Sequence, residues 1–139
     1  MKLLFDSNIW VAAFGAQGVC KQLVEQAIKL DDAAAIQLML CPTIRQEVMR
    51  ILDHKFRLTA DELTRARRVL DGIASAPDGM WQPAGAFPDP DDVPIIGAAL
   101  AGDADLFVTG DKALLELGEI EGLPIVTPRA AFLKLRELE

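Results

Sequence analysis

The chain has 139 residues, of which 51% are hydrophobic and 25% charged, a composition typical of a folded globular protein. This length predicts one domain over residues 1–139, with enough residues to bury a core. The net charge of −7 argues against a simple basic nucleic-acid-binding protein, and no apolar run approaches the roughly 18 residues that a membrane span needs. We therefore expect a cytoplasmic protein that does not associate with membranes.

Short apolar runs alternate with stretches of helical periodicity in the first half of the chain. The predicted elements are a strand at 2–5, a loop or short helix at 7–15, a helix from 19, a strand at 36–41, and helices beginning at 43 and 59. Thr43 precedes Gln46 by three residues, and Thr59 precedes Glu62 in the same way. Each pair predicts a capping box, for helices that run to about His54 and about residue 75.

The second half begins with a connection rich in proline and glycine, residues 76–90. The elements predicted after it are a helix at 92–101, a strand at 106–109, a short helix at 111–117, a strand at 124–127 and a closing helix that starts near Pro128. Strands that alternate with helices indicate an α/β fold with a parallel sheet covered on both faces. Right-handed crossovers would place the carboxyl ends of all these strands at one edge.

Acidic residues recur at that edge. Asp6 follows the first strand, Asp111 follows the strand at 106–109, and the run Asp89-Pro90-Asp91-Asp92 opens an apolar helix. Open α/β folds build their sites at the carboxyl ends of their strands. Converging carboxylates repel one another unless a divalent cation neutralises them, so the pattern predicts a metal site.

Two further acids have alternative interpretations. Glu47 lies about 60° from Ile44 on the helical wheel, at the margin of the apolar stripe, where a salt bridge to an arginine is as reasonable as a metal role. Asp92 could simply cap its helix, and a carboxylate can serve both purposes. Supporting roles around a ligand are predicted for Asn8, Asp89 and Thr109. Trp10 is favoured as a core residue over a base-stacking one.

A basic segment interrupts the acidic chain. Residues 45–68 hold seven basic and four acidic side chains, which leaves +3 there and −10 elsewhere. This segment could follow a phosphate backbone or could be a solvated helical face, and charge alone does not separate the two. The candidate RNA-contacting residues are Arg45, Arg65, Arg67 and Arg68.

Four motifs in this order resemble PIN-domain proteins. They are Asp6-Ser7-Asn8 after the first strand, a helical Glu47, the run at 89–92, and Thr109-Gly110-Asp111-Lys112-Ala113-Leu114-Leu115. The chain is similar over essentially its whole length to the small prokaryotic VapC-like toxins of toxin–antitoxin pairs. The resemblance implies a three-layer α/β/α sandwich with a central parallel sheet of four or five strands. It also implies a divalent-metal-dependent ribonuclease.

Carried over to this chain, the resemblance makes Asp6, Glu47, Asp92 and Asp111 the acidic quartet. Asp6 and Asp92 would be primary ligands, Asp111 a third or a second-metal ligand, and Glu47 a ligand of the second ion or a group that positions water. Many relatives carry another acid where this chain has Ala113, which puts metal number or affinity in doubt. The family's partners would be an RNA substrate, a small antitoxin that covers the acidic groove, and a second copy in a homodimer.

The expected function is hydrolysis of single-stranded RNA with Mg²⁺ or Mn²⁺, because hard oxygen ligands are present and no histidine or cysteine set suggests zinc. One alternative is a Mg²⁺-dependent phosphatase or phosphotransferase. Against it, Asn8 replaces the second acid that aspartyl-phosphate enzymes usually carry, and no glycine-rich phosphate loop is present. Another alternative is a non-catalytic PIN domain that binds RNA or protein, which the intact quartet disfavours.

Overall fold

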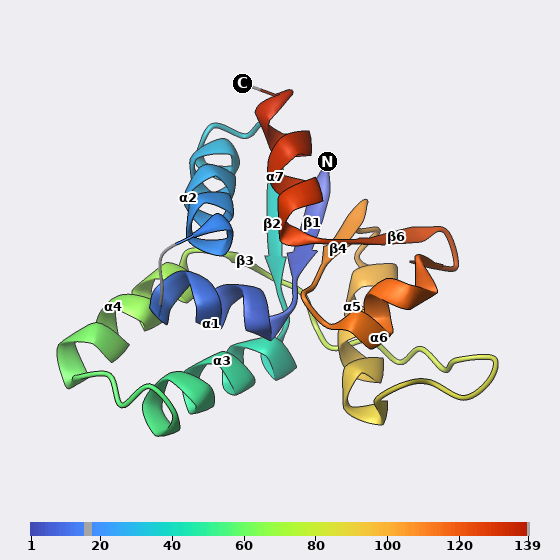
Figure 1. Ribbon diagram of the computed structural model, residues 1–139, viewed down its shortest axis with the longest axis horizontal. Helices are drawn as coiled ribbons and strands as arrows, with labels where there is room; N and C mark the ends of the chain where they lie inside the picture. Colours follow the sequence, from blue (N-terminus) through green and yellow to red (C-terminus); the bar gives the residue numbers. More distant parts are fainter. Residues whose placement is uncertain (16–17, 139) are drawn as a thin grey trace.

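Apolar strands form a mainly parallel sheet at the centre of the molecule (Figure 1). The computed structural model describes residues 1–15 and 18–138. Within them the strands are β1 (Lys2–Phe5), β2 (Gln37–Leu40), β3 (Ala74–Ser75), β4 (Leu106–Val108), β5 (Glu119–Ile120) and β6 (Leu123–Val126). Their order is β3-β2-β1-β4-β6-β5, and every neighbouring pair is parallel except β5 and β6.

Helices cover this sheet on both sides, as expected for an α/β/α sandwich. They are α1 (Ser7–Gly15), α2 (Val19–Asp32), α3 (Pro42–His54), α4 (Ala60–Asp71), α5 (Val93–Ala101), α6 (Lys112–Leu117) and α7 (Pro128–Arg136), with the 3-10 helix η1 (Pro90–Asp92). In Figure 1, α2 and α7 pack side by side in front of the sheet and α5 lies behind it. The predicted three-layer fold is therefore confirmed.

The middle strands are buried because they have neighbours on both edges and helices on both faces. Leu3, Leu4 and Phe5 of β1 are fully inaccessible to solvent, as is Phe107 of β4. Trp10 is also fully buried, with its ring centroid 5.7 Å from that of Phe5. Trp10 is thus a core residue, and a base-stacking role is excluded.

One predicted helix start is confirmed and another is wrong. The Thr59 side chain accepts a hydrogen bond from the backbone of Glu62, whose carboxylate accepts one from Thr59 N–H, a complete capping box. Helix α3 instead begins at Pro42, after Cys41, and Thr43 is already helical. Proline suits the first helical position because its missing N–H would have no partner there. The Thr43 hydroxyl donates to Asp78 instead.

Two boundaries differ because short segments pair with the sheet. Helix α4 ends at Asp71 rather than near residue 75, since Ala74 and Ser75 form the edge strand β3 beside β2. Strand β5, which has no signal in the sequence, consists of two residues that pair with β6. In the described part of the chain no helix is both long and apolar enough to cross a membrane.

Candidate active site

A pocket of about 530 Å³ opens where the carboxyl ends of β1 and β4 meet the starts of α1, η1 and α6, with α3 along its side. In Figure 1 the arrowheads of β1 and β2 point toward this region. The pocket is lined by Asp6, Ser7, Asn8, Val11, Ala12, Glu47, Ile51, Lys55, Phe56, Asp89, Asp92 and Asp111. All four predicted quartet acids therefore lie around one cavity, although 105 positions separate the first from the last.

Asp6 is the most enclosed acid of the pocket, with 5% of its surface exposed. Its backbone N–H extends the sheet by donating to the carbonyl of Val108, at 2.8 Å. Its Oδ1 accepts from the backbone of Ser7 at 2.8 Å, and its Oδ2 accepts from the Thr109 hydroxyl at 2.8 Å. These bonds fix the carboxylate in one orientation.

Thr109 and Asn8 connect the loop after β1 to the loop after β4. The buried Thr109 hydroxyl donates to Asp6 and accepts from Asp111 N–H at 3.1 Å. The Asn8 amide donates to Asp6 at 3.4 Å and accepts from Gly110 N–H at 3.2 Å. Both side chains thus fix Asp6 relative to the segment that carries Asp111. Asn8 and Thr109 were predicted to support the site in this way.

Glu47 reaches the pocket from the side of α3. Its Oε1 accepts a hydrogen bond of 2.8 Å from the hydroxyl of Ser7, the residue after Asp6. The half-buried glutamate is therefore tied to α1. It forms no salt bridge within residues 1–15 and 18–138, so the alternative of an arginine partner is not supported.

Two of the remaining acids cap helices, and the third does not. Asp111 accepts from Ala113 N–H at 2.8 Å and caps α6, while Asp89 accepts from Asp91 N–H at 2.9 Å and caps η1. Asp92 precedes α5 but makes no capping hydrogen bond, because η1 has already turned its backbone into a helical conformation. Asp92 therefore occupies the N-cap position of α5, but its side chain does not cap the helix.

Burial and mutual repulsion make two of the carboxylates hard to ionise. Burial is the largest effect on Asp6 and raises its pKa above 3.8, despite the bonds from Thr109 and Ser7. The pKa of Asp92 rises to about 7, first because the group is desolvated and then because other pocket carboxylates repel its charge. The repelling groups are Asp6, Asp89, Asp111 and Glu47.

The donor chemistry of the pocket fits a hard divalent cation. Within residues 1–15 and 18–138, no three acidic, histidine or cysteine side chains already stand in a metal-binding arrangement. In the described part of the chain, every ionisable side chain around the pocket is a carboxylate except Lys55. A divalent cation would relieve the repulsion that adds to burial in raising the Asp92 pKa, and carboxylate oxygens are the ligands that Mg²⁺ and Mn²⁺ prefer.

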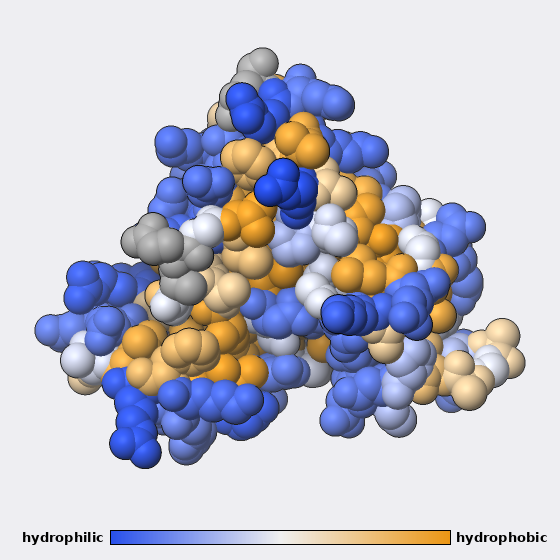
Figure 2. All heavy atoms as spheres, in the orientation of Figure 1, coloured by the Kyte–Doolittle hydropathy of each residue, from blue (hydrophilic) through white to orange (hydrophobic). Residues whose placement is uncertain are grey.

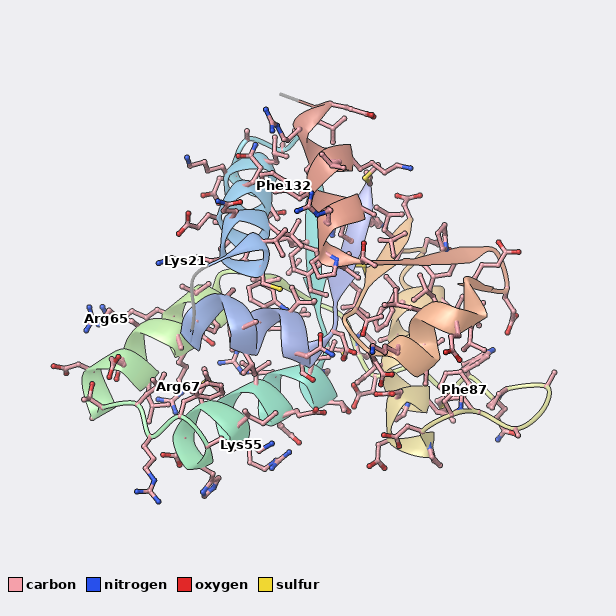
Figure 3. The ribbon with its side chains drawn as sticks, in the orientation of Figure 1. Lys21, Lys55, Arg65, Arg67, Phe87 and Phe132 are labelled. Carbon is pink, nitrogen blue, oxygen red and sulfur yellow. The ribbon has the colours of Figure 1, made fainter. Side chains whose placement is uncertain are left out.

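The predicted RNA-contacting arginines lie away from the acids. Arg45 pairs with Asp71 of α4 on another surface. Arg65 and Arg67 project from α4 (Figure 3), and the exposed Arg68 belongs to the same helix. Instead, the structure brings Lys55 and Phe56 to the pocket. The position of Lys55 could have been predicted from the sequence, because it comes about two helical turns after Glu47 and so lies on the same side of the helix.

Comparisons with known proteins agree with this architecture. The chain matches a family model described as "PIN domain" over residues 2–113, a range that contains all four quartet acids. It is similar to a chain in the crystal structure of VapBC2 from Rickettsia felis bound to a DNA fragment from their promoter, with a TM-score of 0.64 and 13% identity. That match covers 91% of this chain and 98% of the other, and at this identity it shows the fold. No curated protein sequence matches the chain.

Proposed function

Because the chain belongs to the PIN-domain family of nucleases, we propose that it is a divalent-metal-dependent endoribonuclease that hydrolyses phosphodiester bonds of single-stranded RNA. The observation that carries this proposal is the pocket itself. Five carboxylates from four separate segments surround it, and their repulsion adds to the effect of burial in raising the pKa of Asp92 to about 7. Such repulsion is costly in a purely structural site and is typical of a site that binds a cation.

Asp6, Glu47, Asp92 and Asp111 would hold Mg²⁺ or Mn²⁺. A bound ion would lower the pKa of a water molecule and offset the charge that develops on the leaving oxygen. The chain's own contribution is to orient the ligands. Thr109 and Asn8 hold Asp6, and Ser7 holds Glu47, so two ligands are positioned before any ion arrives.

The biological setting is proposed from the fold neighbour. That crystal structure is of VapBC2 from Rickettsia felis bound to a DNA fragment from their promoter. We extend this to the present chain as the toxin of a toxin–antitoxin pair, in the cytoplasm, with a small antitoxin as its protein partner. A homodimer and RNA contact by Arg65, Arg67 and Arg68 belong to the same proposal. Arg45 is a weaker candidate for RNA contact because Asp71 already neutralises it.

Cleavage of mixed single-stranded RNA in Mg²⁺ or Mn²⁺ tests this function. Wild type should cleave only with a divalent ion, and Asp6→Asn or Asp92→Asn should each lower the rate about 100-fold or more, because each removes a ligand charge. Asp32→Asn is the matched control, since Asp32 is exposed at the end of α2 and far from the pocket. Full activity in Asp6→Asn would refute the site. Phosphate release from small phosphoesters without RNA cleavage would favour the phosphatase alternative.

A further inference from the structure

The acidic pocket continues into an apolar groove between α1 and α3. Beyond the acids its walls are Val11 and Ala12 of α1 and Ile51 of α3, and it ends at Lys55 and Phe56. Figure 2 shows hydrophobic surface that extends from the polar centre of the molecule over the region of α1 and α3. One continuous cavity therefore joins the acids to a cation and an aromatic ring.

The spacing along α3 explains this arrangement. Glu47, Ile51 and Lys55 follow one another at intervals of four residues, which places them on the same face of the helix. Eight residues of helix rise about 12 Å, so the charge along the groove changes from negative to positive over roughly that distance. Among the described residues that line the cavity, Lys55 is the one that is basic, and Figure 3 shows it at the end of α3.

Phe56 presents an open aromatic surface at this end. Its ring packs against Gly15, where an added Cβ atom would lie 3.2 Å from the Phe56 Cε1 atom. Because Gly15 has no side chain, the Phe56 ring can pack directly against its backbone. Even so, 46% of Phe56 remains exposed to solvent, a large value for a phenylalanine. Unpaired bases stack on aromatic rings that are held in place by packing and remain exposed to solvent.

We propose that this end of the groove binds nucleotides about three to four positions from the scissile phosphate, with a base stacked on Phe56 and a backbone phosphate at Lys55. The inference rests on the proposed ribonuclease function. A single strand whose phosphate lies at the acids must continue through the same cavity, and 12 Å accommodates three to four stacked nucleotides at 3.4 Å each. Lys55 attracts the phosphates that the acids would repel.

Stacking on a single aromatic ring is tolerant of base identity, because every base has an aromatic face. The groove therefore confers affinity for unpaired RNA and little sequence preference. Paired bases cannot splay onto Phe56, so duplex RNA is expected to bind less well than single strands.

The test measures binding separately from cleavage. Fluorescence anisotropy of a labelled single-stranded RNA of mixed sequence, with Mg²⁺ and in the non-cleaving Asp6→Asn background, gives the Kd. Phe56→Leu should weaken binding about five-fold or more, as for loss of one base–aromatic stack, and Phe56→Trp should restore it. Lys55→Gln should lower the slope of log Kd against log salt by about 0.7. Leucine keeps the apolar contact with Gly15, so the melting temperature should not change.

Matched controls lie on α7, outside the groove. Leu133→Ala removes a side chain that is 54% exposed, and Lys134→Gln removes an exposed charge, and neither should change the Kd or the salt slope. An RNA with one abasic position should bind the Asp6→Asn protein more weakly only when that position lies about three to four nucleotides from the cleavage point. Phe56→Leu should abolish that sensitivity.

The outcomes separate this inference from the ribonuclease assignment. Normal cleavage and an unchanged Kd in Phe56→Leu and Lys55→Gln would refute RNA binding in the groove and leave the proposed ribonuclease function intact. No cleavage by wild type, together with lower RNA affinity in both variants, would overturn the activity and support the groove. If Phe56→Leu and Lys55→Gln lost self-association in sedimentation velocity without a change in RNA affinity, the groove would be an interface between two copies of the chain. That result would contradict the proposed RNA binding.

Discussion

Among the acids of the pocket, Asp92 is the one without a hydrogen-bond donor within residues 1–15 and 18–138. Asp6, Glu47, Asp89 and Asp111 each accept at least one bond from a backbone or side-chain group. These bonds offset part of the cost of placing negative charges together. Asp92 has no such compensation, so its ionisation should carry the largest penalty in the metal-free protein.

Stability of the metal-free protein should therefore depend on the protonation of Asp92. Its pKa is about 7 in the folded state and near 3.8 in the unfolded chain, so the folded protein holds the proton more tightly. The free energy of unfolding should fall as pH rises from about 4 to about 7, then level off for this group. Thermal unfolding in EDTA at pH 5 and pH 8 measures this. Added Mg²⁺ should recover the stability lost at pH 8.

Asp92→Asn isolates this contribution. The variant should melt higher than wild type at pH 8 without metal, because it removes a repelled charge and no capping bond. Asp91→Asn is the control, since Asp91 is exposed beside it and does not line the pocket. An equal loss of melting temperature with pH in wild type and Asp92→Asn would contradict the account. Asp6, whose pKa is also raised, should leave a residual pH dependence in the variant.

Individual acids were predictable to different degrees. Asp6 and Asp111 follow buried strands, and position alone placed them at the sheet edge. Glu47 was found because a carboxylate at the margin of an apolar helix face needs a partner. Phe56 had no such signal, since its role depends on how α3 packs against Gly15. Sequence periodicity describes one helix and contains no information on which residue of another helix it meets.

At the scale of elements, the connection between β3 and η1 fastens two helices of the site together. The Asp78 carboxylate accepts from the backbone and hydroxyl of Thr43 at the start of α3, at 3.2 and 2.8 Å. The next residue, Gly79, donates its N–H to the carbonyl of Pro94 in α5, at 3.1 Å. Residues 78–79 therefore link the helix that carries Glu47 to the helix that follows Asp92.

Close backbone contact makes this link sensitive to one methyl group. A Cβ atom on Gly97 would lie 2.9 Å from the backbone of Gly79, so Gly97→Ala should displace the connection. We expect unfolding in urea to show a loss of about 1–3 kcal/mol, with a lower RNA cleavage rate because Asp92 shifts. Gly85→Ala in the same connection is the control, since nothing lies within 4 Å of its added Cβ.

The two glycine variants should therefore differ clearly. Gly85→Ala should stay within about 0.5 kcal/mol of wild type, as surface changes usually do. If Gly97→Ala matched Gly85→Ala in both stability and cleavage, the link would have no role in the site.

Prediction of elements failed where tertiary contacts overrode local rules. The Thr43-Gln46 pair satisfies the capping-box pattern, but Pro42 starts the helix earlier and Asp78 takes the Thr43 hydroxyl. Asp78, which binds the Thr43 hydroxyl, lies 35 positions away in the sequence. A pattern of four consecutive residues gives no information on such a distant partner. Helix α4 stops at Asp71 for a similar reason, because pairing with β2 draws Ala74 and Ser75 into the sheet.

At the scale of the whole molecule, parallel topology assembles the site. Strands β1 and β4 are neighbours that point the same way, so the residues after them meet although 103 positions separate Asp6 from Thr109. The alternation of strands and helices was enough to predict this edge. The antiparallel strand β5 was not predictable, because two residues provide no periodicity.

The distribution of charge fits the same plan. The protein as a whole carries a net charge of −7, which repels RNA. The carboxylates that line the pocket add to this repulsion. Metal ions at the acids and Lys55 in the groove would each offset part of that repulsion. Single-stranded RNA should therefore bind the metal-loaded protein better than the metal-free one.

Calorimetric titration with Mn²⁺ at pH 8 without RNA shows most simply whether Asp6, Glu47, Asp92 and Asp111 form one metal site. Wild type and Asp32→Asn should bind Mn²⁺ alike, while Asp6→Asn should bind about ten-fold more weakly or not at all, because it loses a buried ligand charge. Failure of wild type to bind Mn²⁺, or equal binding by Asp6→Asn, would show that these four acids do not form a metal site.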